Sequence, residues 1–242
     1  MKAGFDASGD VVVVTGGANG IGAALAQAVV ARGGTAVVLD VATGDAPGVE
    51  YRTVDVSDRE AVAAAVADVV ARHGEITGLV ACAAVQPRVR VEDTEPDAWL
   101  RVIGVNLDGV VWACQAVVPS MRRGGGGAIV MFTSGLAAQG RAEASAYAAT
   151  KGAMIPLAKS LAAEVVGDRI RVNVLAPGVI DTPQFQAANP DGPERAHWER
   201  TTGIGTTDDV VGPLLFLLSD AASMTGSTLS RDRAFSAEGA RR

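Results

Sequence analysis

The sequence has few of the residue types that build metal sites, disulfide scaffolds or nucleic-acid-binding surfaces. It holds two cysteines and two histidines in 242 residues, and aromatic residues make up 4% of it. Cys82 and Cys114 stand in apolar segments at no metal-ligand spacing, so we expect two buried thiols, no disulfide and no metal site. The net charge of −6 offers no basic excess, and we expect neither nucleic acid nor a membrane as a partner.

Signals for export or membrane insertion are also scarce. The first residues carry one lysine and then glycine, aspartate and serine, which is not the pattern of a signal peptide. No uninterrupted apolar run approaches the roughly 20 residues that span a bilayer. We therefore expect a protein of the cytoplasm, where free thiols stay reduced.

Apolar strand-like runs and helical segments alternate along the chain. The runs lack a two-residue alternation of apolar and polar positions, which favours a parallel sheet buried on both faces and wound with right-handed crossovers. The predicted fold class is α/β, a single-domain doubly wound parallel sheet of the Rossmann type over residues 1–242. The expected strands are 11–15, 35–40, 51–54, 77–81, 128–133, 169–175 and 227–229. The expected helices are 21–32, 58–72 (capped by Ser57, with Glu60 at the third position), 96–121, 145–166 and 208–218.

A glycine-rich turn follows the first strand. Gly16, Gly20 and Gly22 are spaced G-x-x-x-G-x-G, and the helix is expected to begin near Ile21. Glycines permit a tight turn and let the main chain approach phosphates closely. Free N–H groups at the N-terminus of a helix bind the negatively charged phosphate oxygens. A strand before the turn and a helix after it predict a dinucleotide site that includes Asn19.

Two carboxylates stand where later strands are expected to end. Asp40 lies eighteen residues after Gly22, where it would accept hydrogen bonds from both ribose hydroxyls of NAD and repel the 2′-phosphate of NADP. Neither Asn19 nor Val41 supplies the positive charge that a 2′-phosphate needs, so we predict NAD as cofactor. From the residues alone, Asp55 is either a contact to the adenine amine or a turn and capping residue.

Tyr147 and Lys151 share one helix face at i and i+4, and Ser134 is expected to end the fifth strand. A nearby ammonium stabilises phenolate and lowers the pKa of tyrosine from about 10, and Ser134 would hold a substrate oxygen beside it. A lone Tyr-x-x-x-Lys pair is most often a surface pair. Together with a dinucleotide turn, the three residues indicate hydride transfer between a nicotinamide and a carbonyl or alcohol carbon.

The combination resembles the single-domain short-chain dehydrogenase/reductase family over nearly the whole chain. The matching elements are residues 15–22, Asp40, Asp55, Val56, Asn106, Ser134, Tyr147, Lys151, Pro177, Gly178 and Thr182. The resemblance implies that Tyr147 is the general acid/base, that Lys151 positions the ribose and tunes Tyr147, and that Ser134 orients the substrate oxygen. It also implies the roles of the remaining positions: Asn106 anchors a water leading from Lys151 to solvent, Asp55 and Val56 meet the adenine, and Ile180 (main chain) and Thr182 (hydroxyl) hold the carboxamide.

Three segments depart from the family pattern. Where the family has Asn-Asn-Ala-Gly, residues 81–84 are Ala-Cys-Ala-Ala, so side-chain bracing is lost, although the main chain at Ala83 is still expected to line the adenosine site. The family's C-terminal pattern breaks after Leu229, where Arg231 and Arg233 would share one side of a strand. Three roles are open for the two arginines. They are solvated charges on a tail, or they pair with a carboxylate on a neighbouring subunit, or they reach the mouth of the active site and contact an acidic substrate. The substrate-covering segment at 183–205 is polar and is expected to be irregular.

These observations favour an NAD-dependent oxidoreductase of small to medium secondary alcohols or ketones. The alternatives are an NADPH-dependent biosynthetic ketoreductase, against which Asp40 argues, and a non-catalytic dinucleotide-binding protein. We also expect a homo-oligomer, with a tetramer favoured, through the helices around Asn106 and Tyr147. His197 stands in a polar loop, where it would either face the substrate or, as is more usual for a lone histidine, be solvated. Candidates for the substrate pocket are Val85, Gln86, Leu136, Gln139, Val179, Phe185 and Trp198.

Overall fold

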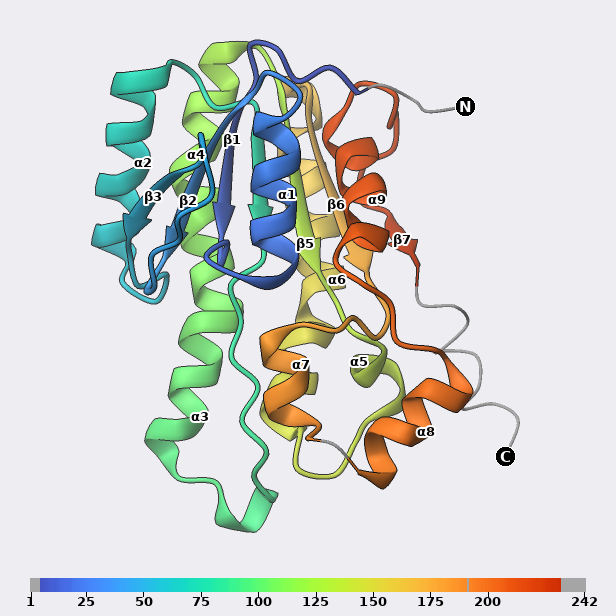
Figure 1. The fold of residues 1–242 in the computed structure, drawn as a ribbon. Coiled ribbons are helices and arrows are strands. Elements are labelled where there is room, and N and C mark those ends of the chain that lie inside the picture. Colours follow the sequence, from blue (N-terminus) through green and yellow to red (C-terminus); the bar gives the residue numbers. More distant parts are fainter. Residues whose placement is uncertain (1–4, 191, 232–242) are drawn as a thin grey trace.

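The computed structural model describes residues 5–190 and 192–231 (Figure 1). These residues form a seven-stranded sheet of order β3-β2-β1-β4-β5-β6-β7, in which each neighbouring pair is parallel. The predicted doubly wound α/β fold is confirmed. The strands are β1 (Val11–Thr15), β2 (Thr35–Asp40), β3 (Glu50–Thr53), β4 (Gly78–Ala81), β5 (Gly127–Phe132), β6 (Ile170–Ala176) and β7 (Thr228–Ser230).

The order of strands reverses at β1. The chain runs outward from β1 through β2 to β3 and then returns to β4 on the other side, so that Thr15 pairs with both Leu39 and Ala81. Ligands of such sheets bind beyond the carboxyl ends of the strands at this switch point. The glycine turn after β1 lies at that place.

Helices cover both faces of the sheet. On one face α1 packs against α9, and α9 against β5; on the other, α2 and α4 pack together while α6 lies on β6. Each face has its own apolar core. Successive residues of the central strands point to opposite faces, so they contribute alternately to one core and to the other. These helices are α1 (Gly20–Val30), α2 (Arg59–His73), α4 (Gly109–Gly124), α6 (Ser145–Val165) and α9 (Asp208–Leu218).

The predicted helix over 96–121 is a longer composite. It consists of α3 (Pro96–Ile103), a π-helical turn η2 (Gly104–Asp108) and α4. In the described residues, the stretch Pro96–Gly124 is the one helix long and apolar enough to cross a membrane by length and composition, although polar and charged residues interrupt its apolar runs. Its apolar residues in α4 pack against α2 and against β4 and β5, as in the core helix of a globular protein.

Two local predictions are wrong. Asp58 caps α2, because its carboxylate accepts hydrogen bonds from the amides of Glu60 and Ala61 at 3.0 Å, whereas Ser57 bonds to Asp55. The segment expected to be irregular forms α7 (Pro183–Ala188) and α8 (Pro193–Thr201). Each begins with proline, whose fixed φ suits the first helical position, and so hydrophobic periodicity is not needed to start them.

The remaining elements are short. They are α5 (Gly135–Gln139) and the 3₁₀ turns η1 (Val91–Asp93) and η3 (Val166–Asp168). In Figure 1, α5, α7 and α8 gather beyond the carboxyl ends of the strands, on the side opposite the N-terminus.

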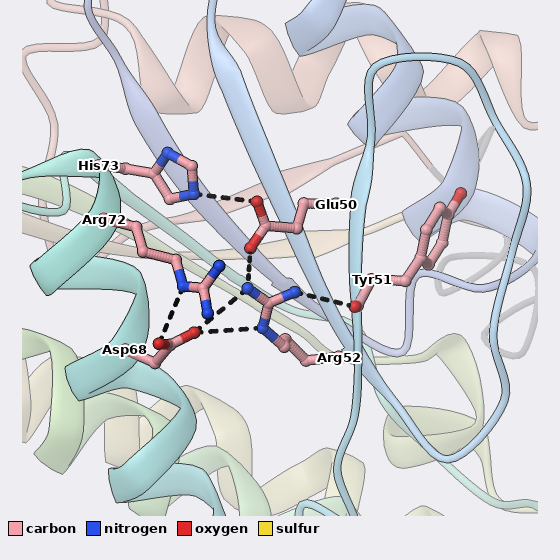
Figure 2. Close-up of polar contacts among 6 residues, drawn as sticks. All are labelled: Glu50, Tyr51, Arg52, Asp68, Arg72 and His73. Atoms are coloured by element: carbon pink, nitrogen blue, oxygen red, sulfur yellow. Dashed lines mark hydrogen bonds and ion pairs between the residues drawn. The ribbon is translucent and has the colours of Figure 1, made fainter.

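The edge strand β3 is tied to α2 by a charged network (Figure 2). Arg52 forms ion pairs with Glu50 and, at 3.1 Å, with Asp68, and Asp68 also pairs with Arg72 at 2.9 Å. The Nε2 of His73 lies 3.0 Å from Glu50. Charged side chains on an edge strand oppose pairing with a strand of another sheet. This network therefore holds β3 against α2 and also disfavours such pairing at this edge.

Candidate active site

A cavity of about 360 Å³ lies beyond the carboxyl ends of β1, β2, β4 and β5. It contains most of the residues that the sequence assigns to the cofactor. These are Gly16, Asn19, Gly20, Ile21, Asp40, Asp55, Val56, Ala83, Tyr147, Lys151, Pro177 and Thr182. The structure therefore brings residues that are far apart in the sequence, from Gly16 to Thr182, together in one cavity wall.

The glycines of the first turn are required by close packing. Gly16 has φ of 68°, and a Cβ there would lie 2.4 Å from the Cα of Ala83. Gly22 lies outside the cavity wall, and a Cβ on it would lie 2.5 Å from the carbonyl oxygen of Gly16. The turn is thus compressed between α1 and the segment after β4, and only glycine fits.

The N-terminus of α1 lacks a side-chain cap. Asn19 occupies the cap position with extended backbone, yet its side chain accepts no hydrogen bond from the helix. In α2, by contrast, Asp58 binds two first-turn amides. First-turn N–H groups without a capping side chain, at the wall of a cavity, suit the phosphates of a dinucleotide.

Asp40 is held by two main-chain amides at the far side of this cavity. Its Oδ2 accepts from the amide of Ala18 and its Oδ1 from that of Ala42, each at 3.0 Å. Each carboxylate oxygen has a second lone pair, so Asp40 keeps acceptors for hydroxyl groups. Val41 beside it also lines the cavity.

Asp55 serves as a turn residue and also lines the cavity. Its Oδ1 accepts hydrogen bonds from the amide and hydroxyl of Ser57 at 2.9 and 2.7 Å, which hold the pKa of Asp55 below its usual value. Arg101 of α3, which sequence reasoning missed, lines the same region, and its charge lowers that pKa further.

A smaller cavity of about 150 Å³ adjoins the first. Both are lined by Ile21, Tyr147, Pro177, Thr182 and Gln184, so these residues form the boundary between them. Ser134, Gly178 and Ile180 line only the smaller one. The phenol of Tyr147 is therefore available to molecules in either cavity.

Tyr147 and Lys151 are close, as their spacing predicts, and both are perturbed by burial. The Nζ of Lys151, a residue 3% exposed, lies 5.8 Å from the centre of the Tyr147 ring. Burial lowers the pKa of Lys151 to about 8. Burial also raises the pKa of Tyr147 to about 12, and a hydrogen bond with Ser134 opposes this rise. The predicted lowering of the Tyr147 pKa is therefore not reached by this chain alone, because desolvation of the phenolate outweighs its neighbours.

Threonines and Ser134 fix the main chain around this pair. The Thr133 hydroxyl donates to the carbonyl of Lys151 at 2.9 Å, and the Thr150 hydroxyl to that of Tyr147 at 2.8 Å. Ser134 caps α5 by accepting from the amide of Leu136 at 3.2 Å. Hydrogen bonds thus fix the main chain that carries the side chains of Ser134, Tyr147 and Lys151.

Asn106 stands behind the cavity wall and lines neither cavity. It is fully buried, accepts from the amide of Val85 at 2.8 Å, and donates to the Val85 carbonyl at 2.9 Å and to Thr150 at 3.3 Å. On the other side of the segment, the amide of Ala83 donates to Thr15 at 3.3 Å. Asn106 and Thr15 supply bracing that residues 81–84 lack.

The strand β6 leads into the loop expected to hold the carboxamide. Thr182 caps α7 by accepting from the amide of Phe185 at 3.1 Å, and Ile180 forms a parallel bridge with Gly205. The Thr182 hydroxyl accepts in this bond, so the bond does not use its hydrogen. The loop is consequently anchored at both of its ends.

The predicted substrate residues divide between the two cavities. Gln86, Leu136, Val179, Phe185 and Trp198 line the smaller one, and Val85 lines the larger. Gln139 and His197 line neither, and His197 packs edge-on against Trp198 with ring centres 5.0 Å apart.

Sequence reasoning missed Arg141, Gln184 and Asn189 in the smaller cavity. Arg141 lies between Ser134 and Tyr147, and a loop joining two site residues was the available signal. Asn189 follows a short helix that the sequence did not predict.

The two cysteines are free thiols. Cys114 is buried, as predicted, while Cys82 is partly buried and lines the larger cavity. Burial raises the pKa of Cys82 to about 11 and that of Cys114 to about 12, so both carry their protons at neutral pH. In the described part of the chain no three His, Cys, Asp or Glu side chains form a potential metal site.

The C-terminal strand is connected to the loop after β6 by Arg231. Its side chain is 15% exposed, and its guanidinium pairs with Asp209 at 3.0 Å and donates to the carbonyl of Pro177 at 3.2 Å. The expectation of a solvated charge is therefore wrong for Arg231, whose carboxylate partner belongs to the same chain. Arg233 lies outside the described residues.

Comparisons with known proteins agree with this geometry. The family model described as "Enoyl-(Acyl carrier protein) reductase" matches residues 16–236. The chain is 36% identical to a probable galactose dehydrogenase from Rhizobium meliloti, covering 91% of this chain and 93% of that protein. It is 37% identical to a cis-4-hydroxycyclohexanecarboxylate dehydrogenase from Sinomonas cyclohexanicum, covering 94% and 96%.

A solved structure extends the comparison to three dimensions. A gluconate 5-dehydrogenase from Burkholderia cenocepacia, in complex with NADP and tartrate, is 31% identical and superposes with a TM-score of 0.88, covering 96% of this chain and 97% of that one.

Proposed function

The chain belongs to the short-chain dehydrogenase/reductase family, and from that premise we propose that it is an NAD-dependent dehydrogenase of small to medium secondary alcohols, with the reverse reduction of ketones. The observation that carries the proposal is the position of Tyr147 at the boundary of the two cavities. A proton acceptor there meets a substrate on one side and a nicotinamide on the other.

The choice of NAD rests on Asp40. Its carboxylate lines the larger cavity and is fixed by the amides of Ala18 and Ala42. A 2′-phosphate beside it would bring two like charges together, which costs several kcal/mol at short range. Gluconate 5-dehydrogenase binds NADP, so cofactor choice varies among these relatives. For the alternative, an NADPH-dependent ketoreductase, the 2′-phosphate of the cofactor would have to bind despite electrostatic repulsion by the Asp40 carboxylate.

The residues around the larger cavity fit such a cofactor. The uncapped N-terminus of α1 would bind its pyrophosphate, and Asp55 and Val56, which line the larger cavity, would contact its adenine. Ala83 would line the adenosine, while the main chain at Ile180 and the hydroxyl of Thr182 would hold the carboxamide. When bound, NAD accepts hydride from the carbinol carbon and returns it in the reverse direction.

Tyr147 accepts the hydroxyl proton of the alcohol as the carbinol carbon loses hydride, and it returns the proton to the alkoxide in reduction. Ser134 holds the substrate oxygen beside the phenol. Lys151 supplies positive charge to the developing phenolate. Together with the positive charge of bound NAD, it would offset the desolvation that raises the Tyr147 pKa in the chain alone. Asn106 would hold a water on the path from Lys151 to solvent.

A non-catalytic dinucleotide-binding protein is the alternative of another class. It has no need for Ser134 and Tyr147 to line one cavity beside a buried lysine. The relatives named above are dehydrogenases of a sugar, a cyclic hydroxy acid and gluconate. A panel of such alcohols, assayed by NADH absorbance with NAD and NADP in parallel, tests the proposal. We expect turnover with NAD; cofactor binding without turnover of any alcohol or ketone would favour the alternative.

We further propose a homotetramer in the cytoplasm, assembled through the faces of α4 and α6. Sedimentation or gel filtration at several concentrations tests the assembly, and a single monomer peak would refute it.

A further inference from the structure

Two glutamine side chains meet at the wall of the smaller cavity. Gln86 follows β4, and Gln184 lies in the first turn of α7, 98 residues further along the chain. The Nε2 of Gln184 donates to Oε1 of Gln86 at 3.4 Å. Both residues line the cavity that Ser134 and Tyr147 also line. A substrate whose reacting carbon lies beside the phenol therefore has these two amides in the same cavity.

The chemistry of the two amides suits hydroxyl groups. A glutamine amide carries two N–H donors and a carbonyl oxygen that accepts two hydrogen bonds. The bond between Gln184 and Gln86 uses one donor and one acceptor position, and it is longer than most N–H···O bonds. A hydroxyl group both donates and accepts, whereas an ionised carboxylate or a ketone only accepts. Hydroxyls are therefore the ligand groups that can use both halves of an amide.

Apolar side chains form other parts of the same wall. Leu136, Val179 and Phe185 line the smaller cavity together with the glutamines. The C–H groups of a carbon chain can pack against such surface while its hydroxyls meet the amides. Small-molecule sites commonly combine apolar walls with a few placed polar groups that fix the orientation of the ligand.

The cavity volumes bear on the size of such a ligand. The smaller cavity has a volume of about 150 Å³, and a protein cavity of about that volume holds a molecule the size of benzene. A short polyol is of similar size. A third cavity, of about 560 Å³, is also lined by Gln86 and Gln184. The pair thus lies at the boundary of the two cavities, and a longer polyhydroxy chain would extend past it.

Resting on the proposed function, we propose that the substrate is a polyol or a sugar, and that Gln86 and Gln184 bind hydroxyls next to the carbon that reacts. The reacting hydroxyl lies at Ser134 and Tyr147, and its neighbours lie at the two amides. A site that binds substrate hydroxyls in this way rejects an analogue that lacks them, because its polar groups are then left without partners. The two glutamines are specificity-determining residues, separate from the groups that move the proton and the hydride.

The test adds hydroxyls to one carbon skeleton. The probes 2-butanol, 2,3-butanediol and threitol share a four-carbon chain with a secondary carbinol and carry none, one and three further hydroxyls. For the wild type with NAD, we expect kcat/KM to rise along this series, with threitol at least about tenfold above 2-butanol. Gln86→Met and Gln184→Met keep the side-chain length and remove the amide. Each should lower the threitol-to-2-butanol ratio of kcat/KM by about 5- to 50-fold, mainly through the KM for threitol.

Gln186→Met is the matched control. Gln186 lies two residues beyond Gln184 in the same helix, but its Nε2 donates to Asp181 at 3.1 Å, and it lines none of the three cavities. The variant makes the same chemical change in the substrate-covering segment without touching the cavity. We expect its threitol-to-2-butanol ratio to stay at the wild-type value.

A second measurement does not depend on turnover. With NADH bound no alcohol is oxidised, and threitol should bind the wild type more tightly than 2-butanol does, as followed by NADH fluorescence. The double variant Gln86→Met, Gln184→Met should lose that difference.

The outcomes separate this proposal from the proposed function. A wild type that prefers 2-butanol, or a threitol preference that survives in both single variants and in the double variant, would overturn the polyol proposal and leave the dehydrogenase function standing. Failure of every alcohol and ketone with both cofactors would instead refute the proposed function. The binding of threitol and 2-butanol to the NADH complex would then decide the role of the two glutamines.

Discussion

The cofactor side and the substrate side of the cleft are built in different ways. The larger cavity is walled by strand ends and main-chain turns, where Gly16 and Ala83 are in close contact and Asp40 is bonded to amides. Residues of the short helices α5, α7 and α8 line the smaller cavity. Figure 1 shows these helices beyond the sheet, and side-chain contacts such as that of Arg141 with Asn189 hold this region together. A wall of main-chain atoms keeps its shape when side chains are substituted, so it suits one constant ligand. A wall of side chains changes with each substitution, so it suits substrates that differ.

The largest expected effect lies at the boundary of the two sides. Tyr147→Phe removes the proton acceptor and leaves both walls in place. We expect kcat to fall by about 10²- to 10⁴-fold, since this is what general acid–base catalysis contributes. The Kd for NADH, measured by fluorescence, should stay close to that of the wild type. Substantial residual turnover would show that another group carries the proton.

The main-chain wall should not tolerate a single added methyl group. Gly16→Ala would place a Cβ 2.4 Å from Ala83 at a residue with φ of 68°. Strain and overpacking should lower the free energy of unfolding by about 3 kcal/mol in urea titrations. Gly212→Ala in α9 is the control, because a Cβ there meets nothing within 4 Å. Equal stability of the two variants would show that the turn is not compressed.

Titration of Lys151 should be visible as a change in stability. Its pKa is about 8 in the folded chain and about 10.4 when unfolded. Between these values the unfolded chain binds more protons at Lys151, so the contribution of Lys151 to the free energy of unfolding rises with pH, by about 2 kcal/mol over pH 8 to 10. The phenol of Tyr147 and the thiols of Cys82 and Cys114 act in the opposite direction, because burial raises their pKa values. The measurement is therefore the difference in free energy of unfolding between the wild type and Lys151→Met, since both keep these three groups. We expect this difference to change by about 2 kcal/mol from pH 8 to 10 in favour of the wild type, and a difference that is independent of pH would contradict the assignment.

Replacing Asp40 sharpens the comparison on the cofactor side. Asp40→Asn keeps an acceptor and removes the charge, so we expect the NADP-to-NAD ratio of kcat/KM to rise by about 10- to 100-fold. Adding Val41→Arg should raise it further by offering a phosphate partner. Asp45→Asn, an exposed residue of the same loop, is the control. A wild type that prefers NADP would refute the prediction before any substitution.

The smallest effect is expected where the C-terminal strand supports the cleft. Arg231→Ala removes the pair with Asp209 and the bond to Pro177. The cost should be about 1 kcal/mol in stability, because the pair is near the surface, with a modest rise in the KM for NAD. Asp209→Asn, which spares the Pro177 bond, should affect stability without changing KM. A KM change of equal size in both variants would place the effect elsewhere.

The sequence predicts the cofactor side well because its signals are local. The glycine spacing, the apolar runs and the residues at strand ends can each be recognised within a short stretch of consecutive residues. As a result, β1, β2 and α9 begin and end at the predicted residues. The role of Asp58 was missed because two adjacent residues offered the same capping chemistry.

The substrate side is less predictable because its contacts join distant positions. The bond of Arg141 to Asn189 and that of Arg231 to Pro177 span 48 and 54 residues with no periodicity to mark them. The pKa of Tyr147 was misjudged for a related reason: the spacing to Lys151 reveals a neighbouring charge, but not how far both groups are withdrawn from water.

Burial of Lys151 also gives the protein a chemical reporter. The chain has three lysines, Lys2, Lys151 and Lys159. An amine with a pKa of about 8 is half unprotonated at that pH, and so it is nucleophilic under conditions in which ordinary lysines are not. Brief acylation at pH 8, followed by peptide mass mapping, would record whether Lys151 is covered. Protection by NAD would then measure cofactor occupancy without any knowledge of the substrate.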